Sequence, residues 1–363
     1  MRLRDFGVVP GWLPTGPLNA MTDVPGVRVG HVTCIEGEGP LEEGVGPIRT
    51  GVTAIVPHGG SLFRDKVAAG VCSLNGFGKA AGFEQIRERG TLETPIILTN
   101  TLNVGRAADA LVGYMLRDHP EIGLRTGTVN PVVAECNDGF LNDLRGRHIG
   151  REQVWAAIDG AAEGPVAEGC VGAGTGTACY QFKGGIGTAS RRVLDGQFTV
   201  SALVQTNMGR RAELRVLGAP IGARLAEQYL PEPGAGSIIM VLATDAPLSA
   251  LQLRRLATRG ALGLARTGAI SGDQSGDFVI AFSTTNRSAH APAALVEQAA
   301  RVNDNSAALD AFFLAAVESV EEAILNALVA ATTMTGRDGH ILHALPHDAL
   351  AEWLAYYRLI EQG

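Results

Sequence analysis

The chain has 363 residues, a formal net charge of −7 and a sequence pI near 5.7. An acidic chain of this kind lacks the clustered lysines and arginines that nucleic-acid binding requires, so nucleic acid is not expected as a partner. No run approaches the ~20 apolar residues that span a bilayer, and residues 1–7 lack the apolar core of a signal peptide. We therefore expect no membrane partner and a cytoplasmic location.

Hydrophobic residues make up 46% of the chain and charged residues only 18%, with 47 glycines. This composition is typical of a compact protein with tight turns and often accompanies subunit contacts, so we expect a homo-oligomer, a tetramer or larger. No linker rich in proline or serine divides the sequence, which favours a single α/β domain over residues 1–363. The five cysteines include no CxxC pair, which favours buried free thiols over disulfides or zinc.

Short apolar segments between glycine-rich turns predict strands in the first two-thirds of the chain, and helical periodicity dominates the last third. The predicted strands are residues 27–33, 51–56, 67–74, 96–99, 128–135, 198–206, 237–244 and 277–284. The predicted helices are residues 105–117, 152–162, 248–266, 292–302, 306–331 and 347–360.

The segment 306–331 carries the clearest helical pattern. Its apolar residues recur at helical spacing, and Glu318, Glu321 and Glu322 form a polar face, so we expect the helix to pack on something flat. Strands and helices of this kind suggest two stacked sheets covered by helices on each outer side. Composition does not distinguish this arrangement from a doubly wound sheet.

The glycine-rich segment 172–187 resembles a phosphate loop only superficially. A phosphate loop places its lysine before serine or threonine, between a strand and a helix, whereas Lys183 is followed by Gly184-Gly185. The segment is either a turn that lets backbone approach backbone or the lining of a site.

The dipeptide Gly236-Ser237 precedes the apolar run 238–244 and follows the flexible stretch 231–235. If the bond between the two residues cleaves itself, Ser237 becomes a chain start that carries both a hydroxyl and an α-amine. The α-amine has a reference pKa of about 7.7–8.0, so near neutral pH it can accept the proton of the adjacent hydroxyl. Serine after a Gly/Pro loop is also an ordinary turn residue, so the dipeptide alone leaves both interpretations open.

An ordered set of motifs extends over about residues 5 to 347. It comprises the segments 16–33, 49–54 and 57–60, Gly174-Thr175-Gly176, the segment 182–190, Gly272-Asp273-Gln274-Ser275-Gly276-Asp277 and the segment 334–340. Together these motifs resemble the DmpA-type L-aminopeptidase/D-esterase family, which includes β-peptidyl aminopeptidases and consists of self-processing N-terminal nucleophile hydrolases. The resemblance implies an αββα sandwich, also seen in the ornithine acetyltransferase relatives, and a glycine-rich segment that lines the site.

The resemblance also assigns catalytic roles. Asn207 ends a predicted strand at the family's Val-Gln-x-Asn position, where an asparagine acts as the oxyanion donor, although asparagine close to glycine is otherwise common in turns. Ser275 and Asp277 match a serine and an acid that orient the nucleophile and its amine. Family members often carry glutamate where this chain has Asp277, so the side chain that holds the carboxylate is one methylene shorter here. Lys183 is expected near the nucleophile as an electrostatic group.

Substrate recognition is expected around Glu135, which ends the apolar run 132–134. A carboxylate at the end of a buried strand usually has a partner. Here the partner is either the free ammonium of a substrate or an arginine such as Arg145 or Arg147. Two positions depart from the family pattern. Asn137 stands where an aromatic residue is common, and Lys79 stands where an acid is common.

These observations predict a serine aminopeptidase or amidase that uses neither metal nor cofactor. It would cleave itself between Gly236 and Ser237 into residues 1–236 and 237–363. Its substrates would be small peptides, aminoacyl amides or esters with a free amino terminus, including β-amino acid peptides. One alternative is an ω-amide oligomer hydrolase or an acyltransferase on the same scaffold, although the relatives of these two kinds resemble enzymes with a threonine nucleophile rather than a serine such as Ser237. The other alternative is a non-catalytic binding protein.

Overall fold

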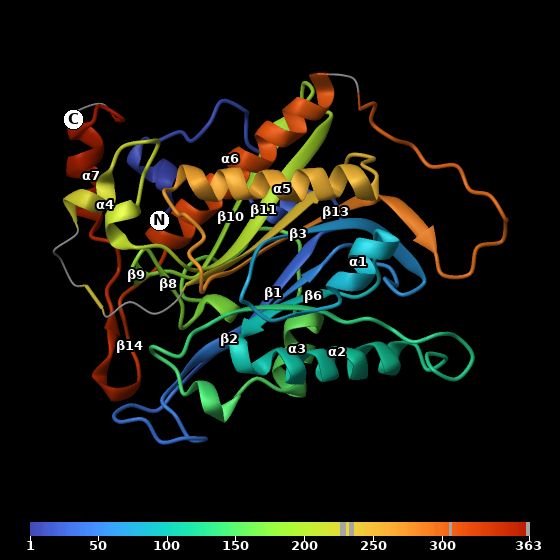
Figure 1. Ribbon diagram of the computed structural model, residues 1–363, viewed down its shortest axis with the longest axis horizontal. Coiled ribbons are helices and arrows are strands. Elements are labelled where there is room, and N and C mark those ends of the chain that lie inside the picture. Colours follow the sequence, from blue (N-terminus) through green and yellow to red (C-terminus); the bar gives the residue numbers. More distant parts are fainter. Residues whose placement is uncertain (226–229, 232–235, 305–306, 361–363) are drawn as a thin grey trace.

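The computed structural model describes residues 1–225, 230–231, 236–304 and 307–360, and these form four layers (Figure 1). One sheet has the order β1 (Arg28–Glu36), β2 (Ile48–Val56), β6 (Ile96–Asn100), β7 (Val132–Cys136), β4 (Ala80–Ala81). The other has the order β10 (Ile186–Val193), β11 (Phe198–Asn207), β12 (Ser237–Thr244), β13 (Gly276–Ala289), β3 (Asp65–Gly76), β5 (Thr91–Leu92).

Helices cover the outer face of each sheet. The first sheet is covered by α2 (Val104–Asp118) and α3 (Arg151–Asp159), and the second by α5 (Ala250–Arg266) and α6 (Ala307–Val329) (Figure 1). The smaller elements are α1 (Phe83–Arg89), α4 (Ile221–Arg224), α7 (His347–Tyr356), the pair β8 (Ala178–Cys179) and β9 (Phe182–Lys183), and the pair β14 (Met334–Thr335) and β15 (Ile341–Leu342). This arrangement confirms the predicted αββα sandwich.

The central strands are buried along their whole length. Every residue of β2 and of β12 is buried, because a helix layer covers one face of the sheet and the second sheet covers the other. The continuous apolar run of β12 is what such a strand requires. β12 is antiparallel to β11 and parallel to β13, so it lies in the middle of the larger sheet.

Most predicted elements are present with shifts of a few residues at their ends, and the strand at 237–244 has the predicted bounds. The prediction of a helix at residues 292–302 is wrong. That segment is irregular, and residues 291–301 are all exposed. A helix of this length is marginal without an apolar face to bury, and of the hydrophobic residues in this segment only Val302 packs against the core. The strand β10, which sequence patterning did not identify, forms the edge of the larger sheet.

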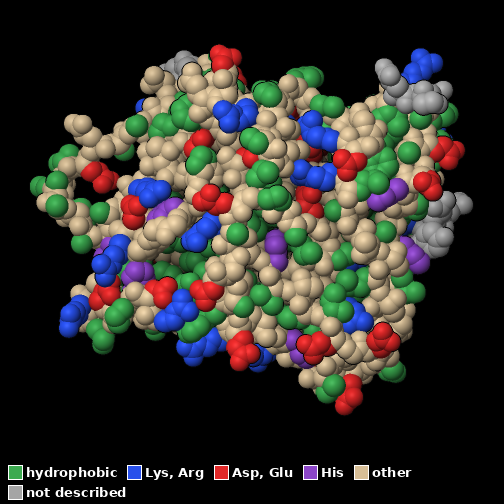
Figure 2. Space-filling view, turned by 180° about the vertical axis from the view of Figure 1, so that it is seen from behind, with side chains coloured by type: hydrophobic (Ala, Val, Ile, Leu, Met, Phe, Trp, Pro, Cys, Tyr) green, Lys and Arg blue, Asp and Glu red, His purple; other side chains and the backbone are tan. Residues whose placement is uncertain are grey.

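The segment 290–304 forms an exposed arm that projects from the body between β13 and α6 (Figure 1). His290 N donates to Arg64 O at one end, and Val302 N donates to Pro247 O at the other. Between them the side chains of Leu295 and Val296 are 102% and 78% exposed. In Figure 2 the arm stands out at the left edge, with much of its surface apolar.

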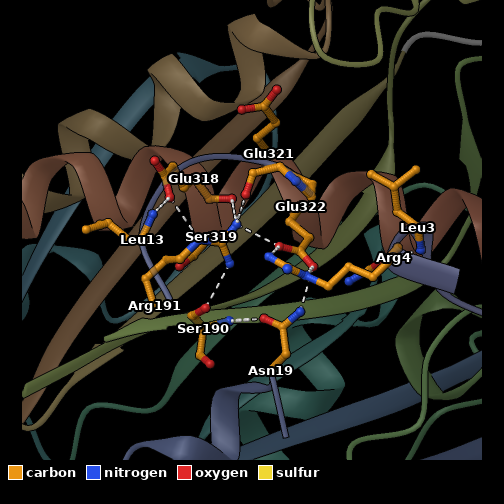
Figure 3. Close-up of polar contacts among 12 residues, drawn as sticks. Leu3, Arg4, Leu13, Asn19, Ser190, Arg191, Glu318, Ser319, Glu321 and Glu322 are labelled. Atoms are coloured by element: carbon orange, nitrogen blue, oxygen red, sulfur yellow. Dashed lines mark hydrogen bonds and ion pairs between the residues drawn. The ribbon is translucent and has the colours of Figure 1, made fainter. Parts of the chain in front are cut away.

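The glutamates of α6 are not a solvent-facing polar face, which corrects the sequence-based prediction. Glu318, Glu321 and Glu322 are all buried. Arg191 of β10 supplies the cation for Glu318 and Glu322, and Arg266 of α5 pairs with Glu321 at 3.1 Å. Arg191 is fully buried and pairs with Glu318 at 2.9 Å and with Glu322 at 2.6 Å (Figure 3). Buried carboxylates are normally paired in this way. The helix does pack on a flat surface, the outer face of β10 and β11.

The same cluster fastens the N-terminal segment to the body. Arg4 adds a second cation to Glu322 at 2.6 Å, and Leu13 N donates to a Glu318 oxygen at 3.1 Å (Figure 3). Arg191 also donates to Pro10 O at 2.8 Å. The first residues of the chain are therefore part of the layer that covers the larger sheet, held by charge-assisted hydrogen bonds.

All five cysteines are free, as predicted, although only Cys136 and Cys179 are buried and the others are half-buried. None of the described helices has the length and the apolar composition needed to cross a bilayer. Acidic and basic side chains are interspersed over the face shown in Figure 2.

Candidate active site

The predicted nucleophile and its predicted partners meet at one end of three adjacent strands. Ser237 is the first residue of β12, and its Cα partner is Asn207, the last residue of β11. On the other side of β12, Ile238 is the Cα partner of Asp277 near the start of β13. Residues that lie 30 and 40 positions from the serine in sequence are thus brought beside it by strand pairing.

Ser237 is only 8% exposed, and its Oγ accepts a hydrogen bond from Gly276 N at 3.1 Å. Position 276 requires glycine, because a Cβ there would lie 2.3 Å from Gly78 Cα and 3.3 Å from the serine oxygen. Backbone around Gly78 therefore closes over the nucleophile. A backbone donor aimed at Oγ favours negative charge on that oxygen, a feature that no side-chain pattern reveals.

The amide of Asn207 has a defined orientation. Its Oδ1 accepts a hydrogen bond from Ala178 N at 3.0 Å, so its Nδ2 is the group left to donate. Asn207 lines a cavity next to the serine. A neutral donor held in place before the reaction begins is what stabilisation of an oxyanion requires.

Ser275 and Asp277 form a short relay. Ser275 Oγ donates to Asp277 Oδ1 at 2.6 Å, and Ile238 N donates to the same oxygen at 3.2 Å. The other oxygen, Oδ2, is buried and makes no hydrogen bond among the described residues. Burial raises the pKa of Asp277 above its ordinary value, against the lowering effect of the Ser275 and Ser271 hydroxyls and of Ile238 N.

Glu135 lies on β7, 2% exposed, and binds the loop that covers the nucleophile. One of its oxygens accepts a hydrogen bond from Lys79 N at 2.9 Å, and the other accepts one from Thr101 Oγ1. Among the described residues it forms no ion pair, and Arg145 pairs instead with Glu43 at 2.7 Å. The carboxylate therefore lacks a protein cation. The neighbouring Cys136 Sγ lies 3.5 Å from Ser237 O.

The two departures from the family pattern have simple local environments. The Lys79 ammonium donates to Phe77 O at 3.0 Å and lies 4.7 Å from the centre of the Phe77 ring, so its charge is held at the surface. Asn137 is exposed and lines the same cavity as Asn207, while its Oδ1 accepts a hydrogen bond from Gly139 N at 2.8 Å.

Lys183 is fully buried and is not among the residues that line the cavities at the nucleophile. Its Nζ donates to Gly174 O, Thr177 O and Gly184 O at 2.8–3.1 Å, which uses all three donors of an ammonium group. Burial lowers its pKa. We therefore revise its expected role from an electrostatic, substrate-binding group near the nucleophile to fastening the glycine-rich segment.

Two cavities flank the residue before the nucleophile. One, of about 530 Å³, is lined by Ser275 and Asp277, and the other, of about 720 Å³, is lined by Asn207 and Asn137. Gly236 borders both of them. The bond between Gly236 and Ser237 therefore lies where the two hollows meet, and both are within the size range of small-molecule sites.

Comparisons with known proteins agree with this geometry. A model of peptidase family S58 matches residues 19–342. The β-peptidyl aminopeptidase BapA of Sphingosinicella microcystinivorans is 46% identical over 374 residues, which cover 98% of this chain and 92% of that protein. A crystal structure from Pyrococcus horikoshii OT3 shares 49% identity and a TM-score of 0.94, with 98% and 99% of the two chains covered.

The L-aminopeptidase D-Ala-esterase/amidase of Ochrobactrum anthropi, a prototype of the serine aminopeptidases with a variant of the Ntn hydrolase fold, is 43% identical. Its structure matches with a TM-score of 0.90 over 98% of this chain and 99% of the other.

Two stacked sheets with a serine at the head of a buried central strand define a hydrolase of the N-terminal nucleophile class. Its enzyme type is that of the serine aminopeptidases and amidases. The chain belongs to peptidase family S58. The predictions of family, fold and enzyme class are confirmed.

Proposed function

We propose that this aminopeptidase matures by breaking its own Gly236-Ser237 bond and that the freed Ser237 is both nucleophile and base. The observation that carries the proposal is Oδ2 of Asp277, which is buried and has no hydrogen-bond partner among the described residues. The other carboxylate oxygen, Oδ1, accepts a hydrogen bond from Ile238 N, and residue 238 directly follows Ser237, whose α-amine cleavage would create. A buried carboxylate oxygen without a partner is costly, and an ammonium at residue 237 supplies the missing partner.

Maturation would proceed through an ester. Ser237 Oγ attacks the carbonyl carbon of Gly236 and its proton passes to the amide nitrogen. The C–N bond then breaks, and the protonated nitrogen leaves as the α-amine of Ser237. Water then hydrolyses the ester to a Gly236 carboxylate and a free serine hydroxyl. Glycine suits this position, because a Cβ at Gly236 would lie 2.6 Å from both Asn207 O and Met208 Cα.

Substrate hydrolysis would repeat these steps on an external carbonyl. The α-amine of Ser237 accepts the hydroxyl proton as Oγ attacks, and Asn207 Nδ2 donates to the oxyanion. The protonated amine then gives its proton to the leaving nitrogen, and water cleaves the acyl-enzyme by the reverse proton transfers. Asp277, held by Ser275, keeps the amine in place throughout.

Glu135 would bind the free ammonium of the substrate. Its carboxylate is buried, accepts hydrogen bonds only from uncharged donors and has no cation among the described residues. Buried charges are normally paired. The loop that binds Glu135 through Lys79 N also closes over the nucleophile at Gly78, so an amine at Glu135 lies near the reacting carbonyl.

The substrates would be short peptides, amides or esters with a free amino terminus, and the relatives' names support β-amino acid peptides among them. The exposed apolar arm 290–304 supports association with a second copy of the chain, in an oligomer of the predicted kind. The cytoplasmic location stays a prediction.

The test is a denaturing gel of purified protein with N-terminal sequencing of the smaller fragment. Two fragments are expected, the smaller beginning Ser-Ile-Ile-Met-Val, and turnover of an aminoacyl p-nitroanilide should accompany them. The Ser237→Ala variant should remain one inactive chain. Turnover by wild-type protein that is still full-length would refute the proposal.

A further inference from the structure

The cavity on the Asn207 side of the nucleophile is cationic. Its wall includes three basic residues, Arg145, Arg337 and His340. Among the described residues its lining has one carboxylate, Asp143, which is 1% exposed and already accepts hydrogen bonds from His148 at 2.9 Å and from backbone amides. The described lining therefore carries more positive than negative charge.

The cavity on the Asp277 side has the opposite charge. Among the described residues its lining includes three carboxylates, Glu213, Asp273 and Asp277, and one cation, Arg210. Because the two hollows meet at Gly236, a molecule bound at Ser237 spans a gradient from acidic to basic surroundings. A carboxylate on such a molecule is repelled from the first hollow and attracted to the second.

Among the basic residues, Arg337 is the one built to receive a ligand. Its Nε donates to Gly139 O at 3.0 Å and its backbone N donates to Leu141 O at 2.9 Å, which fix the side chain. Its Nη1 forms an ion pair with the exposed Asp338 at 3.6 Å, and its Nη2 makes no hydrogen bond among the described residues. The side chain is 27% exposed.

The other two basic groups are engaged elsewhere. Arg145 is 71% exposed and pairs with Glu43 at the surface. The His340 ring stacks on Phe140 with a centroid separation of 4.6 Å, and its Nδ1 donates to Phe140 O at 2.8 Å. Arg337 thus lines the cavity with a guanidinium that is held through Nε and whose Nη2 has no hydrogen-bond partner among the described residues.

We propose that Arg337 binds the C-terminal carboxylate of a short peptide, so that the enzyme prefers free peptides to their C-terminal amides. This inference rests on the proposed function, which places the scissile carbonyl at Ser237 and Asn207. With the substrate ammonium at Glu135, the leaving portion extends into the hollow that Asn207 lines. A planar guanidinium pairs with a carboxylate through parallel hydrogen bonds, which a lysine ammonium does not reproduce.

The experiment compares kcat/KM for a dipeptide and for the same dipeptide as its C-terminal amide. Wild-type enzyme should favour the carboxylate form by about 10- to 100-fold, the value of a charge-assisted hydrogen bond. Arg337→Gln should bring this ratio close to one, and Arg337→Lys should give an intermediate ratio. Arg145→Gln, which removes an arginine already paired at the surface, should keep the wild-type ratio.

The ratio is measured within each variant, so it does not depend on the fraction of protein that is folded and mature. A wild-type ratio near one overturns the inference, and so does an Arg337→Lys variant with the wild-type ratio. If Arg337→Gln lowers both rates equally, the residue only supports Gly139 and the inference fails. Absence of turnover of an aminoacyl p-nitroanilide, which has no carboxylate, would instead count against the proposed function and remove the basis of the inference.

Discussion

Replacing Asn207 tests the chemistry of the site most directly. In Asn207→Asp the oxygen that accepts from Ala178 N at 3.0 Å remains, and only the donor Nδ2 becomes an oxygen. The variant therefore keeps the local hydrogen bond while placing an acceptor and a negative charge where the oxyanion forms. Asn207→Ala removes the donor without adding charge, but it also deprives Ala178 N of its acceptor.

The expected change in kcat and in stability follows from the hydrogen bond that each variant loses. Loss of one oxyanion donor costs about 2.7–4 kcal/mol in the barrier, so kcat of Asn207→Ala should fall by roughly 10²–10³ with KM nearly unchanged. Asn207→Asp should fall further, because like charges repel in a partly dry site. The lost acceptor in Asn207→Ala should cost about 0.5–1.5 kcal/mol of stability, which Asn207→Asp should not show.

The assay must use matured protein, because self-cleavage passes through a similar tetrahedral species and is expected to slow as well. The two fragments are quantified on a denaturing gel, kcat and KM are then measured on an aminoacyl p-nitroanilide, and thermal unfolding reports stability. A rise in KM with kcat unchanged would show that Asn207 only binds the ground state and would refute the assigned role.

Further predictions concern recognition, pH dependence and stability. Glu135→Gln should lower kcat/KM for a free aminoacyl amide by a factor that corresponds to about 1.5–3 kcal/mol of transition-state binding. An equal decrease in kcat/KM for the N-acetyl analogue would show that Glu135 has only a structural role. In uncleaved Ser237→Ala protein, Asp277→Asn should raise the thermal stability above neutral pH. The raised pKa means that the native carboxyl holds its proton more tightly than the unfolded one, so the Asp277 protein loses stability as pH rises from about 4 through the folded pKa. An advantage of the variant that is equal at pH 4 and pH 8 would contradict this. Arg191→Met should cost about 3–5 kcal/mol in chemical denaturation, since it leaves Glu318 and Glu322 buried with fewer cations, and a cost under ~1 kcal/mol would contradict the buried pairing.

The sequence predicted most strands because buried strands carry local apolar runs, and β12 was placed residue for residue. The contacts that depend on distant parts of the chain were not predictable. Glu318 was read as solvent-facing because its cation, Arg191, comes from a strand more than 100 positions away. The segment 292–302 has helical periodicity, but the sequence alone does not show that residues 292–301 are exposed and have no surface to pack against.

The same limit applies to the site. Ser237, Asn207, Ser275 and Asp277 were named from motifs, and the strand register places them together. Backbone groups such as Gly276 N carry no signature in side-chain patterns, so the donor to the nucleophile was missed. The family resemblance of its glycine-rich segment led to the prediction that Lys183 lies near the site. Only the structure shows that its ammonium donates to three backbone carbonyl oxygens.

The position of β12 has a practical consequence for gene design. Because β12 and β13 lie between β11 and β3, a chain that started at Ser237 would still find partners on both sides. Described segments near the two ends of the chain also lie close, since the rings of Phe6 and His347 are 5.5 Å apart. A circularly permuted gene could therefore begin with Ser237 after removal of the initiator methionine, join the old termini through a short linker, and deliver the nucleophile without any cleavage step.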